Sequence, residues 1–199
     1  MKVIYVNHTI TTYTHPLLQK IVAKGCDLIM LIPEKENGTV GQGVEISDNA
    51  NATYKIRYCV SKKGWFGKAV LTDMNTILIQ EKPDILMIGW PYMLQLFFDK
   101  QLRKIIENQG TKVIIQEIPF QTPPYGNLSY FKAHPCYNED MKLISSGLGF
   151  KIRALMTMYI RKQIYKIASA TVNYATCAYD ILPSYGVKRE SIFVRYNTI

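Results

Sequence analysis

The chain has 199 residues, of which 48% are hydrophobic and 20% are charged. This composition is typical of a packed globular protein and excludes collagen-like and disordered polymers. The formal net charge is +9 and the isoelectric point is about 9.3. Such a charge favours anionic partners, namely nucleic acid, phosphorylated lipids or an anionic membrane surface, and does not choose among them.

Membrane spans and targeting segments are not predicted. The longest apolar stretch, residues 85–98, is interrupted by Gly89, Pro91 and Gln95 and is too short to cross a bilayer. The first residues become polar at Asn7, so the apolar core of a signal peptide is missing. We therefore expect a cytoplasmic protein. A peripheral position at the inner face of the membrane is compatible with this expectation.

The N-terminal region predicts a strand, a helix and a second strand. Residues 2–6 form a short run of β-branched and aromatic side chains, which is typical of a buried strand. A polar segment follows, and Pro16 opens a helical pattern that runs to residue 24. Gly25 stands where a helix C-cap belongs, and residues 27–32 form another buried strand. These elements make a βαβ unit.

Strands and helices continue to alternate through the middle of the chain. Residues 53–60 have strand character, and residues 66–81 have apolar residues at helical spacing. Residues 84–89 are a run of the kind found in buried parallel strands. An apolar helix is predicted at 92–108 and a strand at 112–118.

The C-terminal region begins with a long segment of weak pattern. Residues 119–150 contain several prolines and aromatic residues but little period, and loops of that length are usually functional or mobile. The clearest helix of the sequence follows at 151–168. A strand at 170–174, a short helix at 178–185 and a strand at 191–195 complete the chain.

The alternation predicts an α/β protein with a single Rossmann-like, doubly wound parallel sheet. Residues 1–195 are expected to form this domain, and residues 196–199 to begin an interdomain linker. In such sheets ligands bind at the carboxyl ends of the strands. The candidate site therefore consists of the loops that follow the strands, at 7–15, 89–92, 116–120 and 174–177.

Common cofactor and metal motifs are missing from these loops. The first strand is not followed by GxGxxG, which disfavours a dinucleotide, and no Walker phosphate loop or HExxH pattern occurs. The four cysteines are widely spaced and form no CxxC pair, which argues against a zinc site. We therefore expect neither a metal nor a cofactor in this domain.

Six side chains are candidates for binding a sugar. The loop after the first strand offers hydroxyl and imidazole groups for hydrogen bonds, a carboxylate ends a later strand, and an indole could stack on a sugar ring. These candidates are Asn7, His8, Thr9, His15, Trp90 and Glu117. The structural alternatives are a capped loop for the first four, a core or rim position for the indole, and a helix cap or a salt bridge for the carboxylate.

The helix at 151–168 predicts a second kind of surface. Its apolar stripe is expected to face the core and consists of Ile152, Leu155, Met156, Tyr159, Ile160, Ile164 and Ile167. The basic residues around the stripe, Lys151, Arg153, Arg161 and Lys162, are candidates for contact with an anionic membrane. The alternative is an ordinary solvated face above a core stripe.

The C-terminal sequence resembles a known family. The segments Ser169-Ala170-Thr171-Val172-Asn173 and Gly186-Val187-Lys188-Arg189-Glu190-Ser191-Ile192, with Asn197 beyond them, resemble the end of the N-terminal domain of family-4-type (group 1) GT-B glycosyltransferases. Lys82-Pro83-Asp84-Ile85-Leu86 is similar to a strand of the same family. The resemblance covers the chain in element order, but Gln116-Glu117 stands where the family usually has a His-containing strand end, and the glycine pair after its first strand is missing.

The resemblance implies a retaining enzyme of the hexosyltransferase type that uses a nucleotide-sugar donor and a glycan or lipid-linked acceptor. The chain would be its N-terminal, acceptor-side half, inactive alone, with the donor and the catalytic carboxylates in a second domain. The six candidate residues would then bind the acceptor. The alternatives are a flavodoxin-like module that binds a partner or an anion, and a nucleic-acid-binding protein, which is disfavoured because no DNA or RNA motif occurs.

Overall fold

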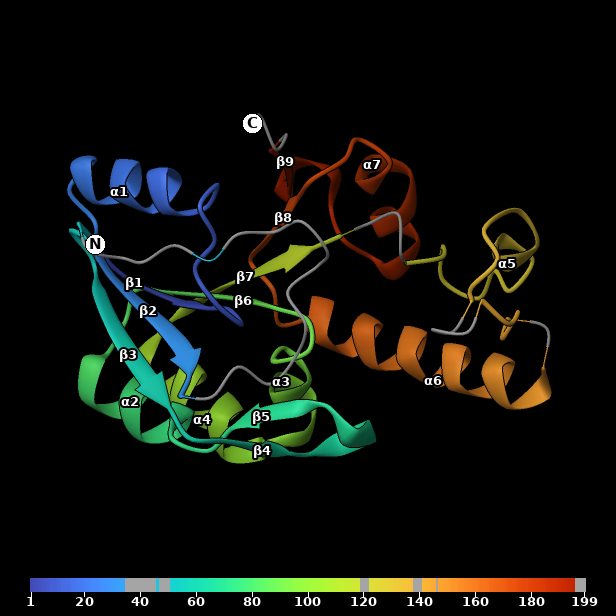
Figure 1. Cartoon of the computed structure of the whole chain (residues 1–199), viewed down its shortest axis with the longest axis horizontal. Coiled ribbons are helices and arrows are strands. Elements are labelled where there is room, and N and C mark those ends of the chain that lie inside the picture. The colour runs from blue at the N-terminus through green and yellow to red at the C-terminus, as the bar shows by residue number, and fades with distance from the viewer. Residues whose placement is uncertain (35–45, 47–50, 119–121, 138–140, 146, 196–199) are drawn as a thin grey trace. The chain divides into compact units, whose positions relative to one another are not determined.

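The computed structural model describes residues 1–34, 46, 51–118, 122–137, 141–145 and 147–195 (Figure 1). The chain forms two compact units, of which the first contains residues 1–116 and the second begins at Glu117. The expected linker at 196–199 lies outside the described residues.

The first unit is built on parallel strands. Their order along the sheet is β3-β2-β1-β6-β7, and every neighbouring pair is parallel. The strands are β1 (Lys2–Val6), β2 (Asp27–Pro33), β3 (Lys55–Cys59), β6 (Ile85–Gly89) and β7 (Lys112–Glu117). Sequence analysis predicted each of them to within about two residues at either end, which is the usual scatter of such boundaries.

Helices cover both faces of this sheet. Helix α1 (His15–Ala23) lies on one face, and α2 (Met74–Glu81) and α4 (Lys100–Gln109) lie together on the other (Figure 1). The inner strands β1 and β2 are therefore buried on both sides, which explains their continuous apolar runs, whereas the edge strand β3 contains Lys55 and Arg57 and is more exposed. The predicted α/β class with a doubly wound, Rossmann-like sheet is confirmed.

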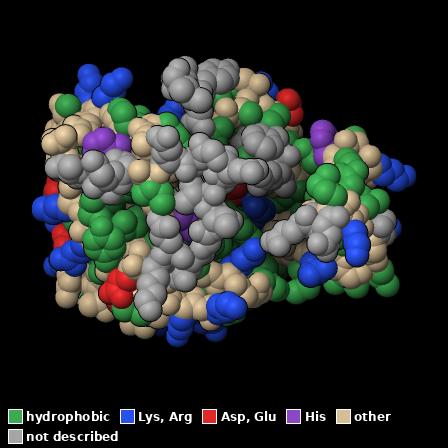
Figure 2. All heavy atoms as spheres, viewed as in Figure 1, with side chains coloured by type: hydrophobic (Ala, Val, Ile, Leu, Met, Phe, Trp, Pro, Cys, Tyr) green, Lys and Arg blue, Asp and Glu red, His purple; other side chains and the backbone are tan. Residues whose placement is uncertain are grey.

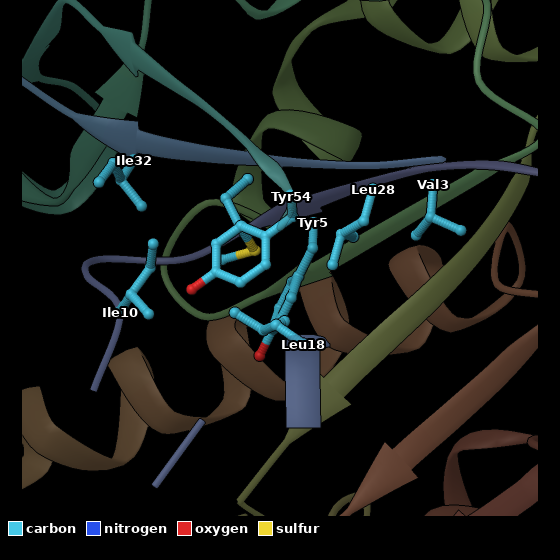
Figure 3. Close-up of a cluster of buried hydrophobic side chains, with 8 residues drawn as sticks. Val3, Tyr5, Ile10, Leu18, Leu28, Ile32 and Tyr54 are labelled. Carbon is cyan, nitrogen blue, oxygen red and sulfur yellow. The ribbon is translucent and has the colours of Figure 1, made fainter. Parts of the chain in front are cut away.

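The core beneath α1 follows from the two-residue period of a strand. Val3 and Tyr5 of β1 and Leu28 of β2 point to the same side, where they pack with Leu18 of α1 and with Tyr54 (Figure 3). Although Tyr5 belongs to this core, it carries a hydroxyl group at the end of its ring, and that group needs a hydrogen-bond partner.

The prediction of a helix at 66–81 is wrong for the first half of this segment. A hairpin of β4 (Ser61–Lys63) and β5 (Ala69–Leu71) precedes α2, with the turn η1 (Trp65–Gly67) between its strands. The turn contains Gly67 at φ +68°, a conformation that glycine adopts without strain and that a helix does not contain.

Gln95 stabilises the hairpin from outside. Its side-chain amide accepts a hydrogen bond from the backbone N–H of Leu71 at 2.9 Å and donates one to the carbonyl oxygen of Leu71 at 3.0 Å. The amide of this buried glutamine thus supplies the two hydrogen bonds that a neighbouring strand would otherwise make with Leu71 of β5. No local sequence pattern predicts this contact.

The helix predicted at 92–108 is divided in two. Helix α3 (Leu94–Phe98) ends at Asp99, whose backbone is extended, and α4 begins directly after it. The Asp99 carboxylate accepts a hydrogen bond from the Leu102 N–H at 3.0 Å and so forms the N-cap of α4.

The second unit has more irregular structure. It contains α5 (Tyr130–Ala133), α6 (Leu148–Tyr165), the parallel pair β8 (Ala170–Asn173) and β9 (Ile192–Val194), and α7 (Ala178–Ile181) followed by the short turns η3 (Leu182–Tyr185) and η4 (Arg189–Ser191). Within the described parts of the chain, no helix combines the length and the apolar character that crossing a membrane requires.

Candidate functional site

Tyr5 and Gln116 meet at the carboxyl edge of the first unit's sheet. The strand register sets Tyr5 beside Met87, and Met87 beside Ile114, so that Gln116 lies two residues further along β7 on the same face. The Tyr5 hydroxyl donates a hydrogen bond to Oε1 of Gln116. Two strands that are not neighbours, β1 and β7, are thus joined by their side chains across β6.

Gly89 of β6 lies close to the backbone of β7 at this edge. It pairs with Gln116 in the register and lies on the same face as Met87, two residues earlier. A Cβ atom at this position would stand only 3.0 Å from the carbonyl oxygen of Gln116 and 3.7 Å from its Cβ. The missing side chain therefore allows the backbone of β7 to approach closely at Gln116.

Asn7 adds a third polar side chain to the pair of Tyr5 and Gln116. Its side-chain nitrogen is 3.5 Å from the Tyr5 hydroxyl, and its side-chain oxygen accepts a hydrogen bond from the backbone N–H of His8 at 2.8 Å. Asn7, Tyr5 and Gln116 therefore form a linked row of uncharged polar groups at the edge where a parallel sheet binds its ligands.

His8 and Tyr92 form a second pair beside this row. Nδ1 of His8 lies 3.2 Å from the Tyr92 hydroxyl, and the two ring centroids are 5.0 Å apart. Tyr92 is buried whereas His8 reaches the surface. Desolvation raises the pKa of Tyr92 to about 12 and lowers the pKa of His8 below 6.5. Both groups are therefore uncharged at neutral pH.

His8 is expected to titrate below its ordinary pKa of 6.5 in the folded chain, because partial burial disfavours the imidazolium. The unfolded state then binds the proton more readily, so folding stability falls as the pH drops below 6.5. An NMR titration of the His8 ring, in the native chain and in urea, measures the difference. Tyr92→Phe is the control: it removes the hydroxyl, keeps the burial and should preserve the shift. A native midpoint at or above the midpoint in urea contradicts this prediction.

The other predicted acceptor residues of the first unit are Thr9, Trp90 and His15. Thr9 is buried, and Trp90 is half-buried directly after β6. His15 is the first residue of α1, and its ring nitrogens lie 2.6 Å from the Tyr54 hydroxyl and 2.8 Å from the Gln19 amide. Both ring nitrogens of His15 thus have partners already. Acceptor binding stays a prediction for all six candidate residues.

Glu117 belongs to a buried polar cluster of the second unit. Its Oε1 accepts a hydrogen bond from the Arg161 guanidinium at 2.5 Å and another from the Tyr165 hydroxyl at 3.0 Å. The same guanidinium nitrogen lies 2.9 Å from the Thr122 hydroxyl. Only 3% of the Glu117 side chain and 11% of the Arg161 side chain are exposed.

The charges of this cluster balance one another. Burial by itself lowers the pKa of Arg161, but the attraction of Glu117 outweighs it and raises the pKa above its usual value. Burial and the neighbouring carboxylate raise the pKa of Tyr165, which therefore stays neutral. The carboxylate is engaged in an internal ion pair, which corresponds to the salt-bridge alternative for Glu117.

The same cluster corrects the predicted membrane surface. Arg161 was expected among the exposed basic residues of its helix, but only 11% of its side chain is exposed, and its guanidinium pairs with Glu117. Lys162 is half-buried, with its ammonium 4.0 Å from the centroid of the Tyr125 ring. Lys151 and Arg153 are exposed as predicted.

A shallow pocket of about 450 Å³ lies beside the β4–β5 hairpin in the first unit. It is lined by Lys62, Lys63, Gly64, Trp65, Val70, Leu71, Thr72, Gln95 and Asp99. Its lysines could attract an anion, whereas one face of Trp65 already stacks on Phe98. Among the described residues, His, Cys, Asp and Glu side chains form no group of three or more that could hold a metal ion.

Comparison with known proteins defines the class of the fold. No protein-family model matches the chain, and no curated protein matches its sequence. A UDP-N-acetylglucosamine 2-epimerase of known structure matches with a TM-score of 0.52 and 14% identity, over 98% of this chain and 47% of that chain. A Listeria monocytogenes protein assigned as a UDP-N-acetylglucosamine 2-epimerase matches with a TM-score of 0.52 and 13% identity, over 96% of this chain and 44% of that chain.

The chain spans less than half the length of these proteins. They have the GT-B fold, which consists of two Rossmann-like halves, and this chain has the fold of the N-terminal half. At such low identity the likeness establishes the fold and leaves the activity open.

Proposed function

We propose that the chain is the acceptor-side domain of a retaining glycosyltransferase. The whole enzyme would transfer a sugar from a nucleotide-sugar donor to a glycan or a lipid-linked acceptor. The donor would bind a second domain, which supplies the rest of the active site. This domain alone would bind the acceptor without turnover.

The proposal depends mainly on the chemistry at the carboxyl edge of the sheet. Asn7, Tyr5 and Gln116 form a row of linked uncharged groups, and His8 beside them has a lowered pKa that keeps it neutral. Sugars present hydroxyl groups that both donate and accept hydrogen bonds, which amides, phenols and neutral imidazoles match. A phosphate would instead favour cations or a helix N-terminus.

Saccharide binding to the chain tests this site directly. Asn7→Ala and Gln116→Ala each remove one amide of the row, and each is expected to weaken binding by about two- to tenfold, the effect of one hydrogen bond. Gln80→Ala, which removes an exposed amide on α2, should leave binding unchanged. Titration calorimetry or ligand-detected NMR with a saccharide panel gives the affinities. Equal binding by all three variants would place the sugar elsewhere.

A second candidate is a nucleotide-sugar epimerase, because the matched solved structures carry that name. The two reactions differ in their products. Transfer releases the nucleotide as a new glycosidic bond forms and requires an acceptor. Epimerisation changes the configuration of the sugar and needs no acceptor.

Incubation of the two-domain protein with UDP-sugars, with and without saccharide acceptors, distinguishes the candidates. Acceptor-dependent release of UDP supports the transferase. A changed sugar without an acceptor supports the epimerase. If no UDP-sugar is consumed and no saccharide binds, the flavodoxin-like binding module is the better interpretation.

A further inference from the structure

Helix α6 has two apolar faces. One is buried in the second unit and consists of Met158, Ile160, Ile164 and Tyr165. The other is exposed and consists of Leu148, Ile152, Leu155, Met156 and Tyr159, with 45% to 75% of each residue's surface accessible. Sequence analysis had expected a single stripe facing the core, and the structure divides that stripe between core and solvent.

The two faces lie on opposite sides of the helix. Each residue turns an α-helix by about 100°, so the five exposed residues fall within an arc of roughly 100°. Seen down the helix axis, the middle of the exposed arc lies near Tyr159. The direction midway between the buried residues Ile164 and Tyr165 is about 180° away from it. No rotation of the helix could bury both faces against this unit. The exposed apolar arc is therefore available to another surface.

Basic residues flank the arc on α6. Lys151 flanks it on one side and Arg153 on the other, and both are exposed. From Met141 to Tyr179 the sequence contains six Lys and Arg residues and no Asp or Glu, and the acidic residues that border this segment are Glu139, Asp140 and Asp180. In the part of the surface formed by α5 and α6, at the right of Figure 2, hydrophobic and basic side chains lie beside one another.

We propose that this face of α6 docks onto an anionic lipid bilayer. The arc of Leu148, Ile152, Leu155, Met156 and Tyr159 would enter the boundary between headgroups and acyl chains, with the helix parallel to the surface. Lys151 and Arg153 would contact the anionic headgroups on either side. The proposal is independent of the reaction that the protein catalyses.

Charge complementarity favours a lipid surface over other occupants. A second copy of the chain would bring the same basic residues against themselves, and such like charges repel. A nucleic acid would attract the cations but would leave the apolar arc in water. An anionic bilayer satisfies both features, because it offers negative headgroups above an apolar layer.

Vesicle sedimentation tests the proposal with the chain as it is. The chain should bind phosphatidylcholine vesicles that contain phosphatidylglycerol, and bind them less as salt rises, whereas pure phosphatidylcholine should retain little. Leu155→Gln combined with Met156→Gln should weaken binding by about tenfold or more, since two apolar side chains no longer enter the interface. Ile79→Gln, at a similarly exposed apolar residue on α2, is the control and should bind like the parent.

A second measurement requires no variant. Backbone amides of α6 between Leu148 and Tyr159 should exchange hydrogen more slowly when anionic vesicles are added to the parent chain. Three results would overturn the proposal: equal binding to phosphatidylcholine alone, unchanged binding by the Leu155 and Met156 double variant, or unchanged exchange in α6 at full vesicle binding. A dimer that this double variant dissociates, with vesicle binding unaffected, would assign the arc to a second copy instead.

Discussion

Replacement of Arg161 by methionine is expected to lower the free energy of unfolding by about 3–5 kcal/mol. The guanidinium is the charged partner of the buried Glu117 carboxylate and also lies within hydrogen-bond distance of Thr122. Arg161→Met would leave a buried carboxylate with the Tyr165 hydroxyl as its one donor from this cluster. A buried, unpaired charge is among the most destabilising changes that a single substitution makes.

The matched control for this prediction is Arg153→Met. It makes the same substitution on the same helix at an exposed position, where a change within about 0.5 kcal/mol is expected. Adding Glu117→Leu to Arg161→Met should recover most of the loss, because it removes the second charge as well. Denaturant unfolding followed by circular dichroism gives these differences. Equal effects of the two arginine substitutions would mean that Glu117 is not held by Arg161.

Gly89→Ala is expected to destabilise the chain by about 1–3 kcal/mol and to separate Tyr5 from Gln116. The new Cβ would lie 3.0 Å from the Gln116 carbonyl oxygen, which belongs to the backbone of β7 and cannot rotate away. The strands β6 and β7 must therefore shift by a few tenths of an ångström at the ligand edge. Saccharide binding should weaken together with stability.

Two further variants make the Gly89 prediction specific. Gln116→Ala should not rescue Gly89→Ala, since the clash is with a backbone atom. Gly149→Ala, at a helical position where a Cβ would meet no atom within 4 Å, should be neutral or stabilising. Unfolding experiments and the NMR signals of the Gln116 side-chain amide report the two effects. Rescue by Gln116→Ala would show that the side chain, not the backbone, limits the space.

The elements that sequence analysis located well are those whose signal is local. The apolar runs of β1, β2 and β6 are continuous because both faces of these strands are buried, and their positions were predicted to within two residues. The prediction failed at residues 66–81, where Val70 and Leu71 match helical spacing but lie in a strand. What makes them a strand is the turn at Gly67 and the hydrogen bonds from Gln95, 24 residues away.

The candidate site was predicted in part. Asn7 and His8 follow the first strand, and topology alone directs attention to the carboxyl end of a parallel strand. Tyr92 and Gln116 lie in loops that were predicted to form the site, but they were not singled out as candidate residues. Tyr5 was missed because a tyrosine in an apolar run is indistinguishable from a core residue. Gly89 was a signal that could have been used, since a glycine at the end of a buried strand indicates close approach of other groups.

The sequence by itself determined the α/β class, the chain order of the parallel strands of the main sheet and the basic character of the chain, because each depends on short-range periodicity or on composition. Only the tertiary structure decided which side chains meet. Glu117 and Arg161 are 44 residues apart, and their pairing turns an expected ligand residue and an expected surface residue into one buried ion pair. Likewise, the helical spacing of apolar residues in the sequence predicts α6. Which of these residues face solvent depends on the neighbours against which the helix packs.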